Sequence, residues 1–216
     1  MSNLLKFDRS TTDSAANSDW RQLLEEVYQG RSLSPYSNGQ TIPLYPDEIL
    51  VVCRGIVRLG TLHESGDEVL LGLAGPSTPF GLPLTLISPY QAIAFSHVDI
   101  MRLSMAEIEN VPSLSHGLFR HLCRRLQQTE AMLALVSNRR VVDRLRQFLL
   151  LLKDEIGQPR ANDTRLSIRL THQNLATAIG TTRVTVTRAL RQLQEEGMIK
   201  LDRRRHIVIM ESAIAE

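Results

Sequence analysis

The chain has 216 residues, of which 43% are hydrophobic, and it carries a formal net charge of +2 at pH 7. This length suits one large or two modest domains with enough apolar residues to bury a core. The two cysteines, Cys53 and Cys123, lie far apart and form no CxxC motif, which argues against a disulfide framework, a structural zinc site or an iron–sulfur cluster and fits a reducing cytoplasm. No run approaches about 18 apolar residues, and the polar start lacks an apolar segment, so we expect neither a membrane span nor a secretory signal.

The small net charge hides an uneven distribution. Residues 1–137 contain 10 Lys and Arg against 14 Asp and Glu, a net charge of −4, whereas residues 138–216 contain 15 against 9, a net charge of +6. Charge asymmetry of this kind is typical of a chain with one nucleic-acid-binding part. A basic surface without a partner is the alternative that charge alone leaves open.

The first part of the chain predicts a polar extension followed by a β-domain. The extension, 1–35, contains one apolar cluster that predicts a short helix over Trp20–Tyr28, and we assign it no role. Residues 36–110 show short apolar runs separated by Gly, Pro, Ser and Asp, which are typical of a small antiparallel β-domain. The best hairpin candidate has Gly66 and Asp67 at its turn.

Residues 111–137 predict one long helix, because a proline opens a stretch in which apolar residues recur at spacings of three and four. A narrow seam on a helix of about six turns is typical of a coiled-coil-like contact between two copies of a chain. We therefore expect a homodimer through residues 114–136, with a helix that lies on its own β-domain as the alternative. The seam consists of Leu114, Leu118, Leu122, Leu126, Thr129, Leu133 and Val136.

The last part, residues 138–216, predicts a compact helical domain with a small β-wing. A second amphipathic helix is expected over 139–155, followed by a loop over 157–164 and a strand over 165–170. Two further helices come next. The wing strands are "MIKL" and "HIVIM", joined by the basic turn "DRRR".

A helix-turn-helix is predicted within this domain. Thr171 is a plausible N-cap for a helix over 172–179, Gly180 supplies a sharp turn at a position that favours positive φ, and Thr182 caps a helix over 183–195. Two short helices joined by a tight glycine turn form the motif whose second helix enters the DNA major groove.

The second helix predicts a DNA-reading face. At about 100° per residue its apolar residues form one core stripe, and Arg183, Val184, Thr187, Arg188 and Arg191 fall on the opposite side. Arginine suits bidentate bonding to guanine, and an exposed valine suits contact with a thymine methyl. The alternative is a solvated basic helix with ion pairs along its surface. The stretch from residue 164 to residue 194 contains no Asp or Glu, although it carries Arg165 and Arg169 as well as the arginines of this face.

Further DNA contacts are predicted around this face. The hydroxyls of Thr182 and Thr185 lie where they could reach phosphates, and Arg203 and Arg204 in the wing turn add phosphate-binding capacity. A solvated basic turn is the alternative for the wing. Thr171 and Gln173, at the start of the first helix of the motif, complete the predicted contact set.

Three motifs resemble those of a known family. "GTTRVTVTRALRQLQEEGMI" resembles the recognition helix of the cyanobacterial nitrogen-control branch of the cyclic-AMP receptor protein and fumarate-nitrate regulator superfamily. "PFGLPLTLISPYQAIAFSHVDI" and "RRLQQTEAMLALV" resemble the same branch more loosely. The resemblance covers residues from about 40 to 210. It implies an α+β fold with a cyclic-nucleotide-binding-like β-barrel (a jelly roll), a long dimerisation helix and a C-terminal winged helix-turn-helix.

The resemblance also implies a DNA site. In that family the residues that match Arg183 and Arg188 read base edges, and the position of Val184 is Glu in the cyclic-AMP branch. The valine implies a different half-site, of the GTA…TAC type. Two-fold symmetry would place the half-sites one helical turn apart, about 34 Å.

The effector cassette departs from the cyclic-AMP pattern. Phe80 and Gly81 are followed by Leu-Pro where that branch carries Gly-Glu, and "SPYQA" replaces its arginine motif. Without those charged partners for the phosphate and ribose, cyclic AMP is disfavoured. Members of the nitrogen branch bind 2-oxoglutarate, and Arg125 and Glu130 match two of its ligands, but Ser88 stands where the third, an arginine, is expected. We therefore predict no cofactor, with 2-oxoglutarate as the open alternative and a salt-bridged Arg125–Glu130 pair as our preferred interpretation.

Together these patterns predict a homodimeric, sequence-specific transcription regulator in the cytoplasm that binds double-stranded DNA. The alternative is a ligand-independent regulator controlled by its abundance or by a protein partner. A catalytic role is not expected, because no Ser–His–Asp set, metal-ligand spacing or phosphate-binding glycine loop is present. Contacts with RNA polymerase leave no readable motif, so that partner and the choice between activation and repression stay open.

Overall fold

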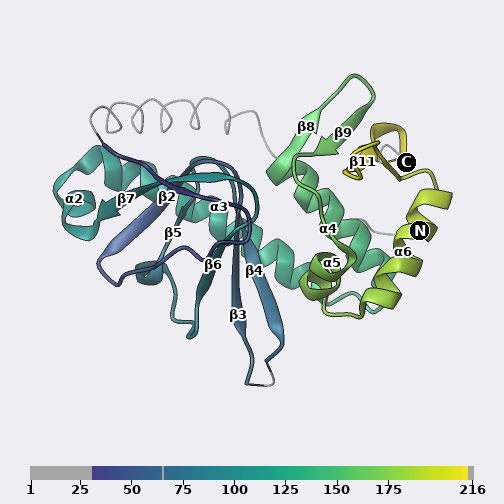
Figure 1. The fold of residues 1–216 in the computed structure, drawn as a ribbon, viewed down its shortest axis with the longest axis horizontal. Helices are drawn as coiled ribbons and strands as arrows, with labels where there is room; N and C mark the ends of the chain where they lie inside the picture. Colours follow the sequence, from purple (N-terminus) through teal and green to yellow (C-terminus); the bar gives the residue numbers. More distant parts are fainter. Residues whose placement is uncertain (1–30, 65, 214–216) are drawn as a thin grey trace. The chain divides into compact units, whose positions relative to one another are not determined.

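The computed structural model describes residues 31–64 and 66–213 (Figure 1). The described residues form two compact units. One contains residues 31–62 and Leu71–Gln127, and the other contains residues 63–64, 66–70 and 128–213. The helix predicted over Trp20–Tyr28 lies outside the described residues. Among the described helices, none has the length and apolar character that crossing a membrane requires.

The N-terminal domain consists of two antiparallel sheets, as the apolar runs predict. Their strand orders are β1-β7-β2-β5 and β4-β3-β6, and a buried cluster of Val, Leu, Ile, Ala and Phe side chains from both sheets forms the core between them. The strands are β1 (Ser34–Tyr36), β2 (Glu48–Arg54), β3 (Val57–Leu62), β4 (Glu68–Ala74), β5 (Pro79–Phe80), β6 (Gln91–Ala94) and β7 (Val98–Ser104).

Strand β2 is buried on both faces, because its apolar residues run consecutively rather than alternating. Leu50 and Val52 belong to the core between the sheets. Ile49 and Val51 point the other way, into a second cluster that includes Leu114 of the following long helix. The domain therefore has a core on each side of its central strand.

The hairpin predicted at Gly66 and Asp67 is confirmed. Strands β3 and β4 are neighbours in one sheet, and the turn between them is closed by two backbone hydrogen bonds. The amide of His63 donates to the carbonyl of Asp67 at 2.9 Å, and the amide of Gly66 donates to the carbonyl of His63 at 2.9 Å. Gly66 has a φ of 84°, which favours glycine.

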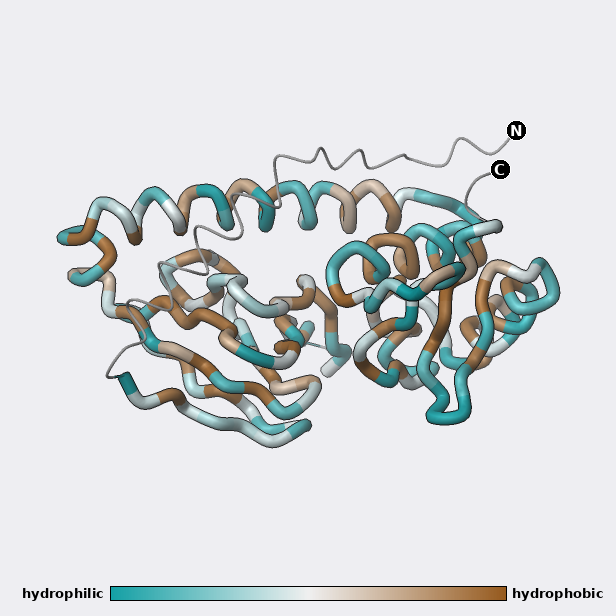
Figure 2. The backbone as a smooth tube through the Cα atoms, turned by 90° about the horizontal axis from the view of Figure 1, so that it is seen from above, coloured by the Kyte–Doolittle hydropathy of each residue, from teal (hydrophilic) through white to brown (hydrophobic). Residues whose placement is uncertain are grey.

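A short helix that the sequence analysis missed precedes the long one. Helix α2 (Met105–Asn110) begins with a capping box, in which the Ser104 hydroxyl accepts from the amide of Glu107 and the Glu107 carboxylate accepts from the amide of Ser104. Helix α3 (Pro112–Val136) follows as one continuous helix, and hydrophobic and hydrophilic turns alternate along it (Figure 2). The long helix predicted from the proline is confirmed.

The predicted seam on α3 is wrong over its first half. Leu114 and Leu118 are 2% and 8% exposed and pack on the β-domain of their own chain, so they are unavailable to a second copy. Leu126 and Leu133 are 60% and 71% exposed. A spacing of four residues advances about 40° around a helix, so leucines four apart wind from the β-domain to solvent instead of forming one stripe.

The second unit contains the other helices and a four-stranded sheet of order β10-β11-β9-β8. The loop and strand predicted over 157–170 are partly wrong, because β8 pairs with β9 as an antiparallel hairpin and the strand ends at Leu166. The predicted second helix and both wing strands are confirmed. The elements are α4 (Val141–Ile156), β8 (Gly157–Pro159), β9 (Asp163–Leu166), α5 (His172–Ile179), α6 (Arg183–Glu195), β10 (Ile199–Leu201) and β11 (Ile207–Met210).

Candidate nucleic-acid interface

Helix α5 begins and ends as its sequence predicts. The Thr171 hydroxyl accepts from the amide of Asn174 at 3.1 Å and donates to the Asn174 side-chain oxygen at 2.6 Å. Gly180 has φ 63° and ψ 57°, and its amide donates to the carbonyl of Ala176. A residue with a Cβ rarely adopts this left-handed conformation. The glycine therefore ends α5 abruptly and lets the chain turn into the next helix.

Helix α6 presents one face to the core and another to solvent. Its N-cap is Thr182, whose hydroxyl accepts from the amide of Thr185 at 3.2 Å. The predicted core stripe is confirmed, because Val186, Ala189, Leu190 and Leu193 are all less than 9% exposed. The opposite face is exposed at all five predicted positions, Arg183, Val184, Thr187, Arg188 and Arg191.

The side chains on this outward face differ in their partners. Val184 is 62% exposed. Within the described part of the chain, no carboxylate pairs with Arg183 or Arg188. Arg191 does have a partner, because its Nε donates to the Glu195 carboxylate at 2.9 Å. An ion pair this exposed contributes little to stability, so the guanidinium of Arg191 is also available to an external anion.

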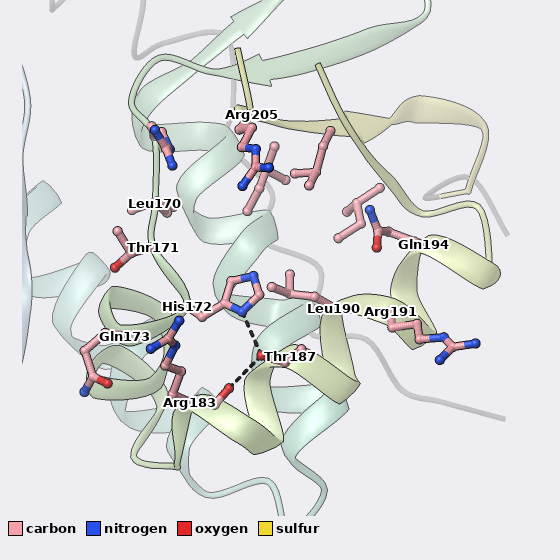
Figure 3. A pocket seen from close by; sticks show the side chains of 14 residues that line it. Leu170, Thr171, His172, Gln173, Arg183, Thr187, Leu190, Arg191, Gln194 and Arg205 are labelled. Carbon is pink, nitrogen blue, oxygen red and sulfur yellow. Dashed lines mark hydrogen bonds between the residues drawn. The ribbon is translucent and has the colours of Figure 1, made fainter. Parts of the chain in front are cut away.

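A groove of about 800 Å³ lies between α5, α6 and the wing strands (Figure 3). Within the described residues its wall carries four arginines and no carboxylate, which suits an anionic occupant. Thr171, Gln173, Arg183, Thr187 and Arg191 of the predicted set line it. Four polar residues that also line the groove were not among the contacts predicted from the sequence. They are Arg169, His172, Gln194 and Arg205.

One of these four could have been found from the sequence. Gln194 lies three residues after Arg191, a spacing that places two side chains on neighbouring parts of one helix face. The other three reach the groove from outside α6, and only the folded chain brings them there.

The wing turn is held by one carboxylate. Asp202 accepts from the backbone amides of Arg204 and His206, each at 2.8 Å, and from Arg165 Nε at 2.8 Å. These hydrogen bonds, that from Arg165 first, hold the pKa of Asp202 well below its usual range. Arg205 adopts a φ of 61°, and the three turn arginines are exposed. Asp202 therefore orders a turn that presents positive charge.

Arg165 consequently does not belong to the outward basic surface suggested by the acid-free stretch. Its side chain is 13% exposed and bonds to Asp202, and its Nη2 donates to Nδ1 of His206 at 2.7 Å. The acid that pairs with it comes from a distant part of the sequence.

The predicted effector residues of the β-domain lie in separate environments. Phe80 is 1% exposed within the core, and a Cβ on Gly81 would lie 2.9 Å from the carbonyl oxygen of Glu48. Arg125 lies against Gly72, where an added Cβ would be 2.4 Å from Arg125 Nη1. Burial raises the pKa of Tyr90, and the positive charge of Arg125 partly offsets that rise.

The preferred Arg125–Glu130 pair is wrong. Residues five apart project about 140° apart around a helix. Arg125 is half-buried against the β-domain, whereas Glu130 is exposed.

Comparison with known proteins connects this geometry to a family. A Crp-like helix-turn-helix domain model matches residues 143–213. The Global nitrogen regulator of Nostoc sp. (strain PCC 7120) is 33% identical over 169 residues, which are 74% of this chain and 75% of that protein. The Global nitrogen regulator of Synechococcus elongatus is 31% identical over 197 residues, 85% of this chain and 88% of that protein.

A solved structure is also similar to this chain. A CRP/FNR-family transcriptional regulator from Thermus thermophilus superposes with a TM-score of 0.67 at 26% identity, covering 83% of this chain and 94% of that one. The solved structure therefore has a fold similar to that of this chain. The chain is a member of the CRP/FNR family of DNA-binding transcription regulators, and not an enzyme.

Proposed function

We propose that the protein acts as a homodimer on a two-fold symmetric DNA site of the GTA…TAC type, which it reads through α6. The outward face of α6 carries this proposal. Arg183 and Arg188 have no carboxylate partner among the described residues, and Val184 is 62% exposed. Arginine forks bond guanine O6 and N7, and an apolar side chain contacts the thymine methyl, which together suit a half-site that contains both bases.

Six of the other predicted contacts fit phosphates rather than base edges. Thr182 and Thr185 lie at the start of α6, with their hydroxyl oxygens 2.8 Å apart. Arg203 and Arg204 lie on the wing turn and are exposed. We assign these four residues, with Thr171 and Gln173, to the DNA backbone, where contacts fix the orientation of the protein without reading sequence.

The dimer contact is proposed on the exposed stripe of α3. Exposed residues there recur at alternating intervals of three and four, the heptad spacing of a two-stranded coiled coil. Glu130 occupies one seam position, where a polar residue specifies register at a cost in stability. The stripe consists of His116, Phe119, Cys123, Leu126, Glu130 and Leu133. We retain 36–110, 111–137 and 138–216 as the functional divisions of the chain.

Selection of bound DNA from a random pool, at fixed salt, tests the DNA readout. A two-fold symmetric consensus is expected. Arg183→Ala and Arg188→Ala should each weaken binding by about 1–3 kcal/mol per half-site, roughly 5- to 150-fold for each half-site, and relax the preference at one base pair of each half-site. Arg160→Ala is the matched control, because Arg160 is an exposed arginine of the β8–β9 turn outside the groove. Equal binding by all three variants would contradict the assignment of base contacts.

Cysteine cross-linking tests the seam. Cys123 is exposed at a seam position, and Cys53 is half-buried in β2. Mild oxidation should yield a covalent dimer in the wild type and in Cys53→Ser, but none in Cys123→Ser. Leu126→Glu should shift the protein to monomers in sedimentation velocity. A dimer that persists in Leu126→Glu and does not cross-link would place the interface elsewhere.

For the effector domain we propose that cyclic AMP is not a ligand. Leu82 and Pro83 form part of a 3₁₀ turn that directly follows Gly81, in the place where the cyclic-AMP branch has a ligand carboxylate. Constitutive binding, controlled by abundance or by a protein partner in the cytoplasm, is the companion proposal. Calorimetric titration with cyclic AMP and with 2-oxoglutarate separates the alternatives, because heat from either would overturn ligand independence.

A further inference from the structure

A chain of two hydrogen bonds links the two helices of the DNA-binding motif. The Thr187 hydroxyl lies 2.9 Å from the carbonyl oxygen of Arg183, to which it donates, and 2.7 Å from Nδ1 of His172. Thr187 belongs to α6, whereas His172 is the first residue of α5. The contact therefore fixes the imidazole ring at the wall of the groove (Figure 3).

This arrangement determines which ring nitrogen carries a proton. A hydroxyl has a single hydrogen, and a carbonyl oxygen can only accept. We assign the Thr187 hydrogen to the carbonyl of Arg183. The Thr187 oxygen then accepts from His172, which assigns an N–H to Nδ1. In a neutral imidazole the other nitrogen, Nε2, is then an acceptor. It points away from Thr187 into the groove (Figure 3).

The groups around the ring are cationic. Arg169 comes from the segment before α5, Arg183 and Arg191 come from α6, and Arg205 comes from the wing, and the described groove wall has no carboxylate. A groove wall of this charge suits an anionic occupant.

In the proposed complex, the DNA backbone occupies the part of this groove next to His172. The first helix of a helix-turn-helix crosses the backbone while the second reads bases, and His172 belongs to the first. Phosphate oxygens only accept hydrogen bonds, so Nε2 must donate to make the contact. With Nδ1 already donating to Thr187, both nitrogens then carry protons and the ring is an imidazolium.

We propose that His172 is a phosphate contact that forms only in its protonated state, so that DNA binding takes up one proton at each protomer. The inference rests on the proposed seating of the helix-turn-helix on DNA. It makes affinity increase as pH falls, because acid supplies the proton that binding consumes.

Calorimetry with the full-length protein and its selected DNA site tests this. Titrations at one pH in buffers of different ionisation enthalpy count the protons taken up, and binding curves from about pH 5 to 8, at constant salt, give the slope. His172→Gln should abolish the uptake yet still bind, because an amide N–H donates to phosphate without a proton from solution. His206→Asn, at the wing histidine that bonds to Arg165, should keep the uptake.

Variants at Thr187 test the role of the two hydrogen bonds that link His172 to the carbonyl of Arg183. Thr187→Ser retains the hydroxyl and should retain the uptake. Thr187→Val removes the acceptor, which lets a neutral ring place its proton on Nε2, so the number of protons taken up per protomer should fall whatever the affinity of this variant for the site. Uptake by His172→Gln equal to that of the wild type, or full uptake by Thr187→Val, would overturn the proposal. A wild type that binds no specific site would instead contradict the proposed function.

Discussion

Gly180 allows a test of the turn that sets α6 in place. The residue sits at φ 63° and ψ 57°, and a Cβ built there meets nothing within 4 Å. Gly180→Ala therefore adds no clash, and its cost is backbone strain alone, about 1–2 kcal/mol. For a chain of this length that corresponds to a fall in Tm of roughly 2–4 °C per kcal/mol. Asn tolerates the left-handed conformation better, so Gly180→Asn should cost less than Gly180→Ala.

Gly157 provides the opposite case in the same unit. Its backbone is ordinary, with φ −72°, but a Cβ would lie 2.1 Å from the carbonyl oxygen of Lys153 and 2.5 Å from Cγ2 of Thr164. Here the larger side chain should be worse, so Gly157→Asn should unfold at a lower temperature than Gly157→Ala. Thermal unfolding followed by circular dichroism measures all four variants. The same ranking of Ala and Asn at both glycines would refute the assignment of strain to one and steric clash to the other.

Two further predictions concern charges inside each unit. The pKa of Asp202 is lowered mainly by its hydrogen bond from Arg165. The ionised carboxylate therefore stabilises the folded protein above about pH 4, its unfolded pKa, and this stabilisation is lost as the pH falls toward the folded pKa. In unfolding measurements at a series of pH values, Asp202→Asn should be less stable than the wild type at neutral pH, and the difference should disappear in acid. Gly72→Ala should displace the Arg125 guanidinium, because the new Cβ would lie 2.4 Å from Nη1. Removal of that positive charge should raise the pKa of Tyr90 further, and ultraviolet titration of the tyrosines, with Tyr90→Phe as the reference, should detect it.

The helix-turn-helix could be predicted because its signals are local. Thr171 and Thr182 accept from amides three residues away, and Gly180 ends a helix through its own backbone conformation. Each of these features depends on a few consecutive residues, so a single sequence contains the information. The buried stripe of α6 follows from helical periodicity in the same way.

Contacts between distant residues could not be predicted in this way. The seam on α3 fails at Leu114 and Leu118 because the β-domain, formed earlier in the chain, covers them. The acid-free stretch suggested that Arg165 was unpaired, but Asp202 approaches it from the wing 37 residues away. Periodicity shows that a residue is buried or exposed on an element, but not which other element covers it.

These distant contacts divide the described cationic side chains of the basic unit into those paired with a carboxylate and those left unpaired on α6. In the basic unit, Arg146, Lys153, Arg165 and Lys200 each bond to a carboxylate 37 or more residues away in the chain. These pairs connect helices and strands of the domain. Within the described residues no carboxylate reaches Arg183 or Arg188, although the same domain contains acids enough to supply them. The fold therefore directs its carboxylates to the scaffold and leaves positive charge on α6, where DNA phosphates and guanine acceptors can replace the missing partners.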